Sequence, residues 1–182
     1  TPGGSRYPAV NKIIKDRVQE GALIVNYTGH GGEVGWAHER ILDIATINSW
    51  TNRYRMPVMV TATCEFSKFD DYTRTSAGEL CLLNPNGGAI ALLTTTRVVY
   101  ANPNFEINLD FVQNLFKWYD LGGVVRLGDV YRDTKRQYVN SSGGINHLNF
   151  SLLGDPALEL AMPRNQVVTT KINDKDFSSF SD

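Results

Sequence analysis

The sequence lacks the features that define several large classes of protein. Only two of its 182 residues are cysteines, Cys64 and Cys81, too few for a disulfide-rich scaffold, although counting alone leaves a bond between them open. No apolar run approaches the roughly 20 residues that span a bilayer. The formal net charge of -1 gives no electrostatic reason to expect nucleic acid as a partner. The N-terminal residues do not form a signal peptide.

Helical and strand patterns alternate along the chain. Apolar residues at helical spacing predict helices over about 8–20, 43–50, 75–83, 105–119 and 127–138. Runs that are apolar throughout predict buried strands at 23–27, 57–63 and 89–94, and we expect a last strand at 157–161. This alternation predicts an α/β fold, a three-layer α/β/α sandwich with a mostly parallel sheet.

The residues after Pro163 have a different pattern. Residues 167–172 alternate as a β-strand does, so we expect the tail, residues 164–182, to begin a following β domain. The main domain is then expected to cover residues 1–163.

A histidine and a cysteine follow two consecutive predicted strands. His30 lies in a loop, Thr28-Gly-His-Gly-Gly32, after the first strand, and Cys64 ends the second. Ligands of parallel sheets bind at the carboxyl ends of the strands. If these two strands are parallel neighbours, the thiol and the imidazole meet at one edge of the sheet. We therefore predict a nucleophile and its general base at that edge.

The chemistry of these groups fits attack on a carbonyl carbon. The thiolate is the nucleophile, and imidazole is its usual activator, since a free thiol has a pKa of about 8.5. Imidazole can later protonate a departing amine. The glycines beside His30 let a substrate backbone approach, and the N–H groups of Gly31 and Cys64 are suited to form an oxyanion hole.

Less specific interpretations apply to the same residue types. A single cysteine at the end of an apolar strand is usually just buried, and a single loop histidine is usually structural. We interpret Cys81 as a packing residue, and His38 and His147 as structural or surface groups. The loop carboxylates are expected either to orient His30 or bind a cation, or to be solvated: Glu33, Asp70 and Asp71. Neither a phosphate loop nor a zinc site is supported by the spacing.

Several motifs resemble the gingipain family of cysteine peptidases, which belongs to the caspase-like clan. They are Tyr27-Thr-Gly-His-Gly-Gly32, Gly35-Trp36 and Thr61-Ala-Thr-Cys-Glu65. Within the family, the PorU-type signal peptidases and sortases of type IX secretion are more similar, in stretches that include 35–40, 63–71, 84–97 and 153–157. The resemblance extends from about Pro8 to about Pro163.

The resemblance implies a role for each matching residue. Cys64 would be the nucleophile, His30 the catalytic histidine, and the Gly31 and Cys64 amides the oxyanion donors. Tyr100 aligns with an aromatic residue of the specificity pocket, and we expect Gly32 and Glu65 to contact substrate as well. The acidic residue that assists the histidine in gingipains lies upstream of the matched region, so the resemblance implies a truncated catalytic domain.

The resemblance further implies a cysteine-type endopeptidase at the bacterial cell surface, on the extracellular side of the outer membrane. It would remove the C-terminal sorting domains of secreted proteins through a thioacyl intermediate, resolved by water or by the amine of a surface glycolipid. Other type IX secretion components are implied partners. No cofactor is implied, and calcium binding does not follow from the sequence. Two alternatives remain open: a gingipain-like endopeptidase, and a non-catalytic caspase-like binding module.

Overall fold

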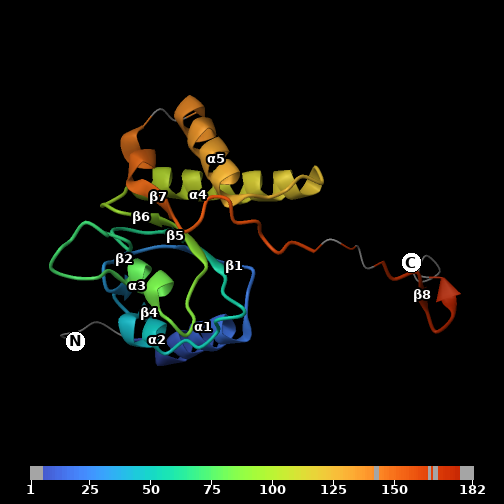
Figure 1. The fold of residues 1–182 in the computed structure, drawn as a ribbon, viewed down its shortest axis with the longest axis horizontal. Coiled ribbons are helices and arrows are strands. Elements are labelled where there is room, and N and C mark those ends of the chain that lie inside the picture. The colour runs from blue at the N-terminus through green and yellow to red at the C-terminus, as the bar shows by residue number, and fades with distance from the viewer. Residues whose placement is uncertain (1–5, 142–143, 164, 166–167, 177–182) are drawn as a thin grey trace.

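A four-stranded sheet forms the centre of the computed structural model, which describes residues 6–141, 144–163, 165 and 168–176 (Figure 1). Its strands, in spatial order, are β1 (Ile24–Thr28), β5 (Val58–Ala62), β6 (Ala91–Thr95) and β7 (Phe150–Leu153). β1, β5 and β6 run parallel, and β7 is antiparallel to β6. The predicted mostly parallel sheet is therefore confirmed.

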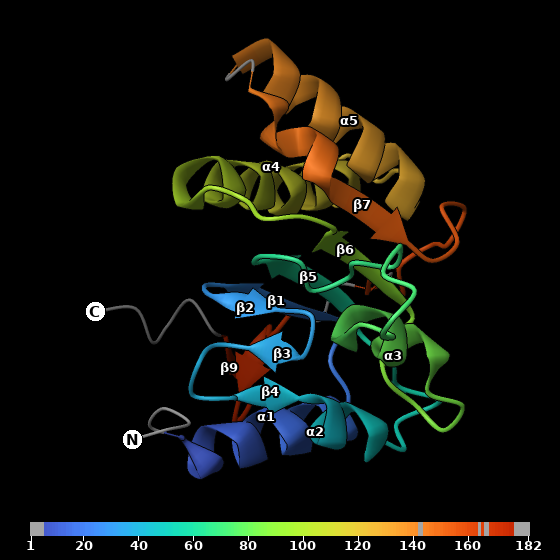
Figure 2. The ribbon, with the colours of Figure 1, turned by 90° about the vertical axis from the view of Figure 1, so that its left-hand side faces the viewer.

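Helices cover both faces of this sheet (Figure 2). The helices on one face are α1 (Pro8–Glu20), α2 (Ile44–Asn48) and α3 (Ala77–Leu83). The opposite face carries α4 (Ala101–Asp120) and α5 (Leu127–Ser141). No helix among the described residues is long and apolar enough to cross a membrane.

The two faces of β5 supply two separate apolar cores. Val58, Val60 and Ala62 pack with α4 and α5, whereas Met59 packs with the helices of the other face. Successive side chains of a strand point to opposite faces, so a strand covered on both sides must be apolar throughout. All five residues of β5 and all five of β6 are buried. This explains why the sequence identified these strands most clearly.

The helix ends predicted from local sequence signals are also confirmed. Pro8 occupies the first turn of α1, and Gly21, with φ of +105°, follows its end. Asp43 caps α2, its Oδ1 accepting the Thr46 N–H at 2.8 Å. Ser76 begins α3 in a capping box with Glu79.

The expected strand at 157–161 is wrong. The fourth strand is β7, at Phe150–Leu153, which is preceded by a 3-10 helix, η1 (Ile145–Asn149). Gly154, with φ of +126°, then turns the chain away from the sheet. Glu159 makes only an isolated bridge with Arg126. The place beside β6 is already taken by β7, so the alternating run after it stays outside the sheet.

A small antiparallel sheet lies beyond the carboxyl end of β1, next to α1 and α2 (Figure 2). Its strands are β2 (Gly31–Gly32), β3 (Gly35–Trp36) and β4 (Leu42–Asp43). The segment that we expected to be loop as far as Gly32 therefore ends in a two-residue strand. In the tail, β8 (Lys171–Ile172) and β9 (Lys175–Asp176) form a hairpin. The division into a domain over 1–163 and a tail over 164–182 stays a prediction.

Candidate active site

His30 and Cys64 follow the carboxyl ends of neighbouring parallel strands. Thr28 at the end of β1 pairs with Ala62 at the end of β5. The Gly29 N–H extends this ladder by donating to the Ala62 carbonyl at 3.2 Å. His30 and Cys64 each lie two residues beyond the paired ends. The predicted placement of both at one edge of the sheet is thus confirmed, whereas their catalytic roles stay predictions.

Two donors hold the backbone of His30. The Tyr27 hydroxyl donates to the His30 carbonyl at 2.7 Å, and the Ala37 N–H donates to the same oxygen at 2.7 Å. The Tyr27 ring stacks on Trp36, with centroids 4.3 Å apart and planes 8° apart. Burial, assisted by the negative charge of Glu39, raises the pKa of Tyr27 above its ordinary value. The hydroxyl therefore remains a donor at neutral pH.

The imidazole of His30 is exposed and lies beside a second imidazole. The centroids of the His30 and His38 rings are 6.3 Å apart. Among the described residues, no carboxylate hydrogen-bonds to the His30 ring. The observed hydrogen bonds therefore fix the backbone of His30, while its ring is exposed to solvent.

The three loop carboxylates considered for orienting His30 have other partners. They pair with neighbouring side chains: Glu33 with Lys68, Asp70 with Arg97 and Asp71 with Thr73. The Arg97 guanidinium holds the pKa of Asp70 below its ordinary value. No group of three or more His, Cys, Asp or Glu side chains in the described part of the chain is arranged to hold a metal ion. These carboxylates stabilise the loops rather than contact the imidazole.

The two thiols are free and have different surroundings. Cys64 is half-buried, and its Sγ lies 3.7 Å from the Val99 carbonyl oxygen. Cys81 is 0% exposed, and burial strongly raises the pKa of its thiol. A buried thiol of raised pKa is unreactive. The interpretation of Cys81 as a packing residue is confirmed, and Cys64 is the accessible thiol.

The pairing of β2 with β3 leaves the Gly31 N–H free of the small sheet. Gly31 faces Trp36 in the β2–β3 pair, and the Ala37 N–H bonds to the carbonyl of His30. This pattern makes Gly31 and Trp36 a non-hydrogen-bonded pair, so the Gly31 N–H points away from β3. A Cβ at Gly31 would overlap the buried Thr63 hydroxyl, which leaves room only for glycine. The oxyanion role of Gly31 and Cys64 stays a prediction.

The residues expected to contact substrate lie near the dyad of Cys64 and His30. Tyr100 is 79% exposed and follows Val99, whose carbonyl contacts the Cys64 sulfur; its N–H donates to Asn146 Oδ1 at 3.2 Å. Glu65, next to the thiol, has φ of +49° and pairs with Lys68 at 3.3 Å. Gly32 pairs with Gly35 in the small sheet. Their contacts with substrate stay predictions.

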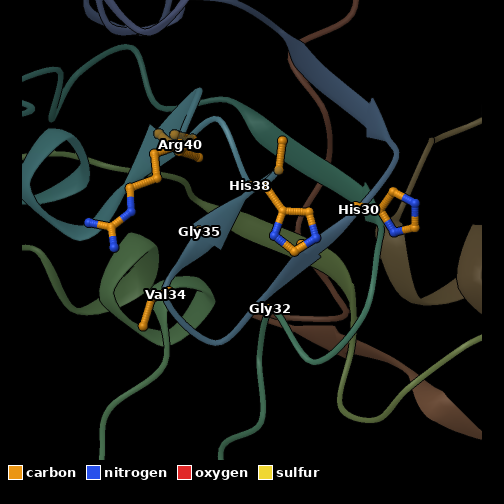
Figure 3. Close-up of a pocket in the computed structure, with 9 residues that line it drawn as sticks. His30, Gly32, Val34, Gly35, His38 and Arg40 are labelled. Atoms are coloured by element: carbon orange, nitrogen blue, oxygen red, sulfur yellow. The ribbon is translucent and has the colours of Figure 1, made fainter. Parts of the chain in front are cut away.

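Sequence reasoning missed a hollow next to His30 (Figure 3). Its volume is about 580 Å³. The side chains and backbone around it come from His30, β2, β3 and the turn up to β4: His30, Gly31, Gly32, Val34, Gly35, Ala37, His38, Arg40 and Leu42. His38, interpreted as structural or surface, is exposed and faces this hollow, whereas His147 is structural, bonding through Nδ1 to the Gly144 carbonyl at 2.7 Å.

The turn that shapes the hollow gave no local signal. Ala37 and Arg40 have φ of +58° and +54°, values that a sequence usually marks with glycine or asparagine. The two hydrogen bonds from Tyr27 and Ala37 to the His30 carbonyl form a backbone clamp. The sequence did not predict this clamp, because it depends on the stack of Tyr27 and Trp36 across β1 and β3.

Comparisons with known proteins agree with this geometry. A family model described as Peptidase family C25 matches residues 1–161. The fold resembles the crystal structure of the Arg-specific cysteine proteinase gingipain R, with TM-score 0.72 and 22% identity over 86% of this chain. It also resembles RgpB of Porphyromonas gingivalis, in a complex of its pro- and mature domains, with TM-score 0.70 and 20% identity over 86% of this chain. The chain spans 37% of each of these solved chains. No curated protein matches it.

Proposed function

The chain belongs to peptidase family C25, and we propose that it is the catalytic part of a PorU-type peptidase and transpeptidase that removes C-terminal sorting domains from secreted proteins. The observation that carries the proposal is the placement of Cys64 and His30 at the carboxyl ends of two paired parallel strands. The peptidase chemistry rests on this geometry and on the family. The sorting role rests on the PorU-type sequence stretches described above.

The reaction begins at the Cys64 sulfur. His30 takes the thiol proton, and the thiolate attacks the scissile carbonyl carbon, forming a carbon–sulfur bond. The Gly31 and Cys64 amides bind the oxyanion, and removal of one such donor typically costs about 2.7–4 kcal/mol of transition-state stabilisation. His30 then gives its proton to the amine as the carbon–nitrogen bond breaks.

The thioacyl enzyme must be resolved by a second nucleophile. Water gives a free carboxylate, and an amine of a surface glycolipid gives a new amide. In both cases His30 accepts the proton of the incoming nucleophile, and Cys64 leaves as a thiolate. The proposed site of action is the extracellular side of the outer membrane, where secreted substrates and other type IX secretion components would meet the enzyme.

The full-length protein tests the proposal through Cys64→Ala. We expect processing of a substrate carrying a sorting domain to fall by orders of magnitude, each tenfold corresponding to about 1.4 kcal/mol of barrier. Cys81→Ala removes the other thiol and is the matched control, which should retain processing because Cys81 is buried away from the strand ends. Normal processing by Cys64→Ala would end the proposal.

A gingipain-like endopeptidase is the second candidate, favoured by the likeness to an Arg-specific proteinase. A peptide panel separates the two, because a strong preference for Arg or Lys on the acyl side of the cut supports the endopeptidase. Iodoacetamide separates both from a binding module. A Cys64 thiol that reacts no faster than a model thiol at about pH 6–7 would indicate a module without activated sulfur.

A further inference from the structure

We propose that the hollow next to His30 binds an acidic side chain on the leaving-group side of the polypeptide substrate, with Arg40 as the residue that selects it. We call it the Arg40 hollow, with the lining residues given above. The inference rests on the proposed function, because it assigns the two halves of a cleaved polypeptide to two sides of the dyad.

The strand order gives the direction of the substrate. Tyr100 follows β6, Cys64 follows β5 and His30 follows β1, and these strands are neighbours in that order. The Arg40 hollow lies on the separate small sheet of β2, β3 and β4, which Figure 2 shows on the side of β1 away from β5. The edge of the sheet thus presents an exposed aromatic ring, a thiol, an imidazole and a hollow in sequence.

The chemistry of His30 then assigns the halves. The protonated imidazole delivers its proton to the departing amine, so the leaving group lies on the His30 side of the acyl carbon. Cys64 does not line the hollow, whereas His30 does. The acyl half of the substrate accordingly lies toward Tyr100, and the leaving half lies over the Arg40 hollow.

The hollow carries positive charge without a neutralising carboxylate. The titratable groups that line it are the Arg40 guanidinium and the imidazoles of His30 and His38 (Figure 3). Among the described residues, no ion pair joins Arg40 to an acid, and no Asp or Glu lines the hollow.

The acids nearest in sequence are engaged on other sides. Asp43 lines an adjoining depression together with Arg40, but it caps α2 through Thr46 and forms no ion pair with the guanidinium; Glu33 pairs with Lys68 at 3.1 Å. Glu39 does not line the hollow, and its charge acts on Tyr27, whose hydroxyl bonds to the His30 carbonyl.

An unpaired guanidinium at an otherwise largely apolar hollow favours a carboxylate over an amide or an ammonium group. The guanidinium presents planar donors that match a carboxylate, and desolvation strengthens such charge-assisted bonds. The wall contributed by the exposed side chain of Val34 accepts the methylene groups of an Asp or Glu side chain. A volume of about 580 Å³ accommodates one such side chain with neighbouring backbone.

Peptide binding to the full-length protein tests this assignment. The host is Cys64→Ala, which separates binding from cleavage. The probes are fluorescent peptides that span the junction before a sorting domain, with Asp, Asn or Lys at each of the first three positions after the scissile bond. We expect the best Asp peptide to bind about tenfold more tightly than its Asn counterpart, which corresponds to one close charge pair.

Three variants on the same host locate the preference. Arg40→Gln should reduce the Asp-to-Asn ratio to about twofold or less, and Arg40→Lys should keep part of it by keeping the charge. Arg53→Gln removes an exposed arginine near the amino end of β5, at the opposite edge, and should leave the ratio unchanged.

The outcomes are distinct from those of the proposed function. If the Cys64→Ala host binds the Asp and Asn peptides equally, the inference is overturned before any substitution of Arg40 is tested. A ratio that survives Arg40→Gln overturns it as well. Failure of the wild-type protein to cleave any of the peptides argues against the proposed function, but the binding ratio still decides the role of Arg40.

Discussion

Removal of a single oxygen tests whether the backbone clamp on His30 matters for catalysis. Tyr27→Phe deletes the hydroxyl that donates to the His30 carbonyl and keeps the ring that stacks on Trp36. The substitution adds no atom and leaves the half-buried ring in place. Any effect therefore reports the hydrogen bond and not the packing.

The expected loss of stability is small. A typical hydrogen bond contributes about 0.5–1.5 kcal/mol, and the His30 carbonyl keeps the Ala37 N–H at 2.7 Å as a second donor. We therefore expect about 0.5–1 kcal/mol, the lower half of that range. For a chain of this size, that is a fall in Tm of roughly 1–4 °C.

The expected loss of activity is larger in proportion. Misplacement of a catalytic group by about 1 Å can cost about 100-fold in rate. The loop of His30 loses one of two tethers, so we expect a smaller shift and a fall of about tenfold in kcat, with KM nearly unchanged. Urea unfolding and steady-state kinetics of the full-length protein measure the two quantities.

The pH dependence of stability checks the burial of the same hydroxyl. Burial raises the pKa of Tyr27 above 10.0, so its contribution to stability is present below pH 10.0 and is lost as pH rises through the folded pKa. Tyr72→Phe, at a tyrosine that is 99% exposed, is the matched control. Unchanged kcat in Tyr27→Phe, or a fall matched by Tyr72→Phe, would refute the role of the clamp.

Two further predictions concern stability. A Cβ at Gly78 would overlap the buried Ser67 hydroxyl, so Gly78→Ala should reduce the free energy of unfolding by about 1–3 kcal/mol. Adding Ser67→Ala should restore part of this free energy. The overlap would be contradicted if urea unfolding showed no restoration in the double variant. Burial lowers the pKa of Lys135 from 10.5 to about 8, so the folded state binds this proton more weakly, and stability should rise between about pH 8 and 10.5. Lys135→Met should lack this rise, and parallel pH profiles of both proteins would disprove it.

The sequence was most informative where burial fixes the pattern. β5 and β6 are covered on both faces, so every residue had to be apolar or small, and the strands were found with boundaries shifted by only one or two residues. Asp43 and Ser76 identified helix starts because capping is a local interaction. β7 was missed because the choice between Phe150–Leu153 and the alternating run at 157–161 depends on which segment pairs with β6 in the folded chain. That is a tertiary property.

The same distinction applies to the candidate site. The positions of His30 and Cys64 could be predicted because parallel neighbours present their carboxyl ends at one edge. The Arg40 hollow could not be predicted because it depends on a turn in which Ala37 and Arg40 take positive φ without a glycine. The alternatives left open for Glu33, Asp70 and Asp71 could be decided only by the structure, in which they bind Lys68, Arg97 and Thr73 rather than His30.

The sheet and the loops therefore contribute differently to catalysis. Neighbouring strands are about 4.8 Å apart, so the pairing of Thr28 with Ala62 brings the starting points of both loops within reach of one carbonyl group. A change inside the sheet moves both loops together, so it mainly changes the free energy of unfolding. A change in the clamp formed by Tyr27 and Ala37 moves the imidazole relative to the sulfur, so it mainly changes kcat. Substitutions that lower kcat with little change in the free energy of unfolding should accordingly cluster in the loops beyond β1 and β5.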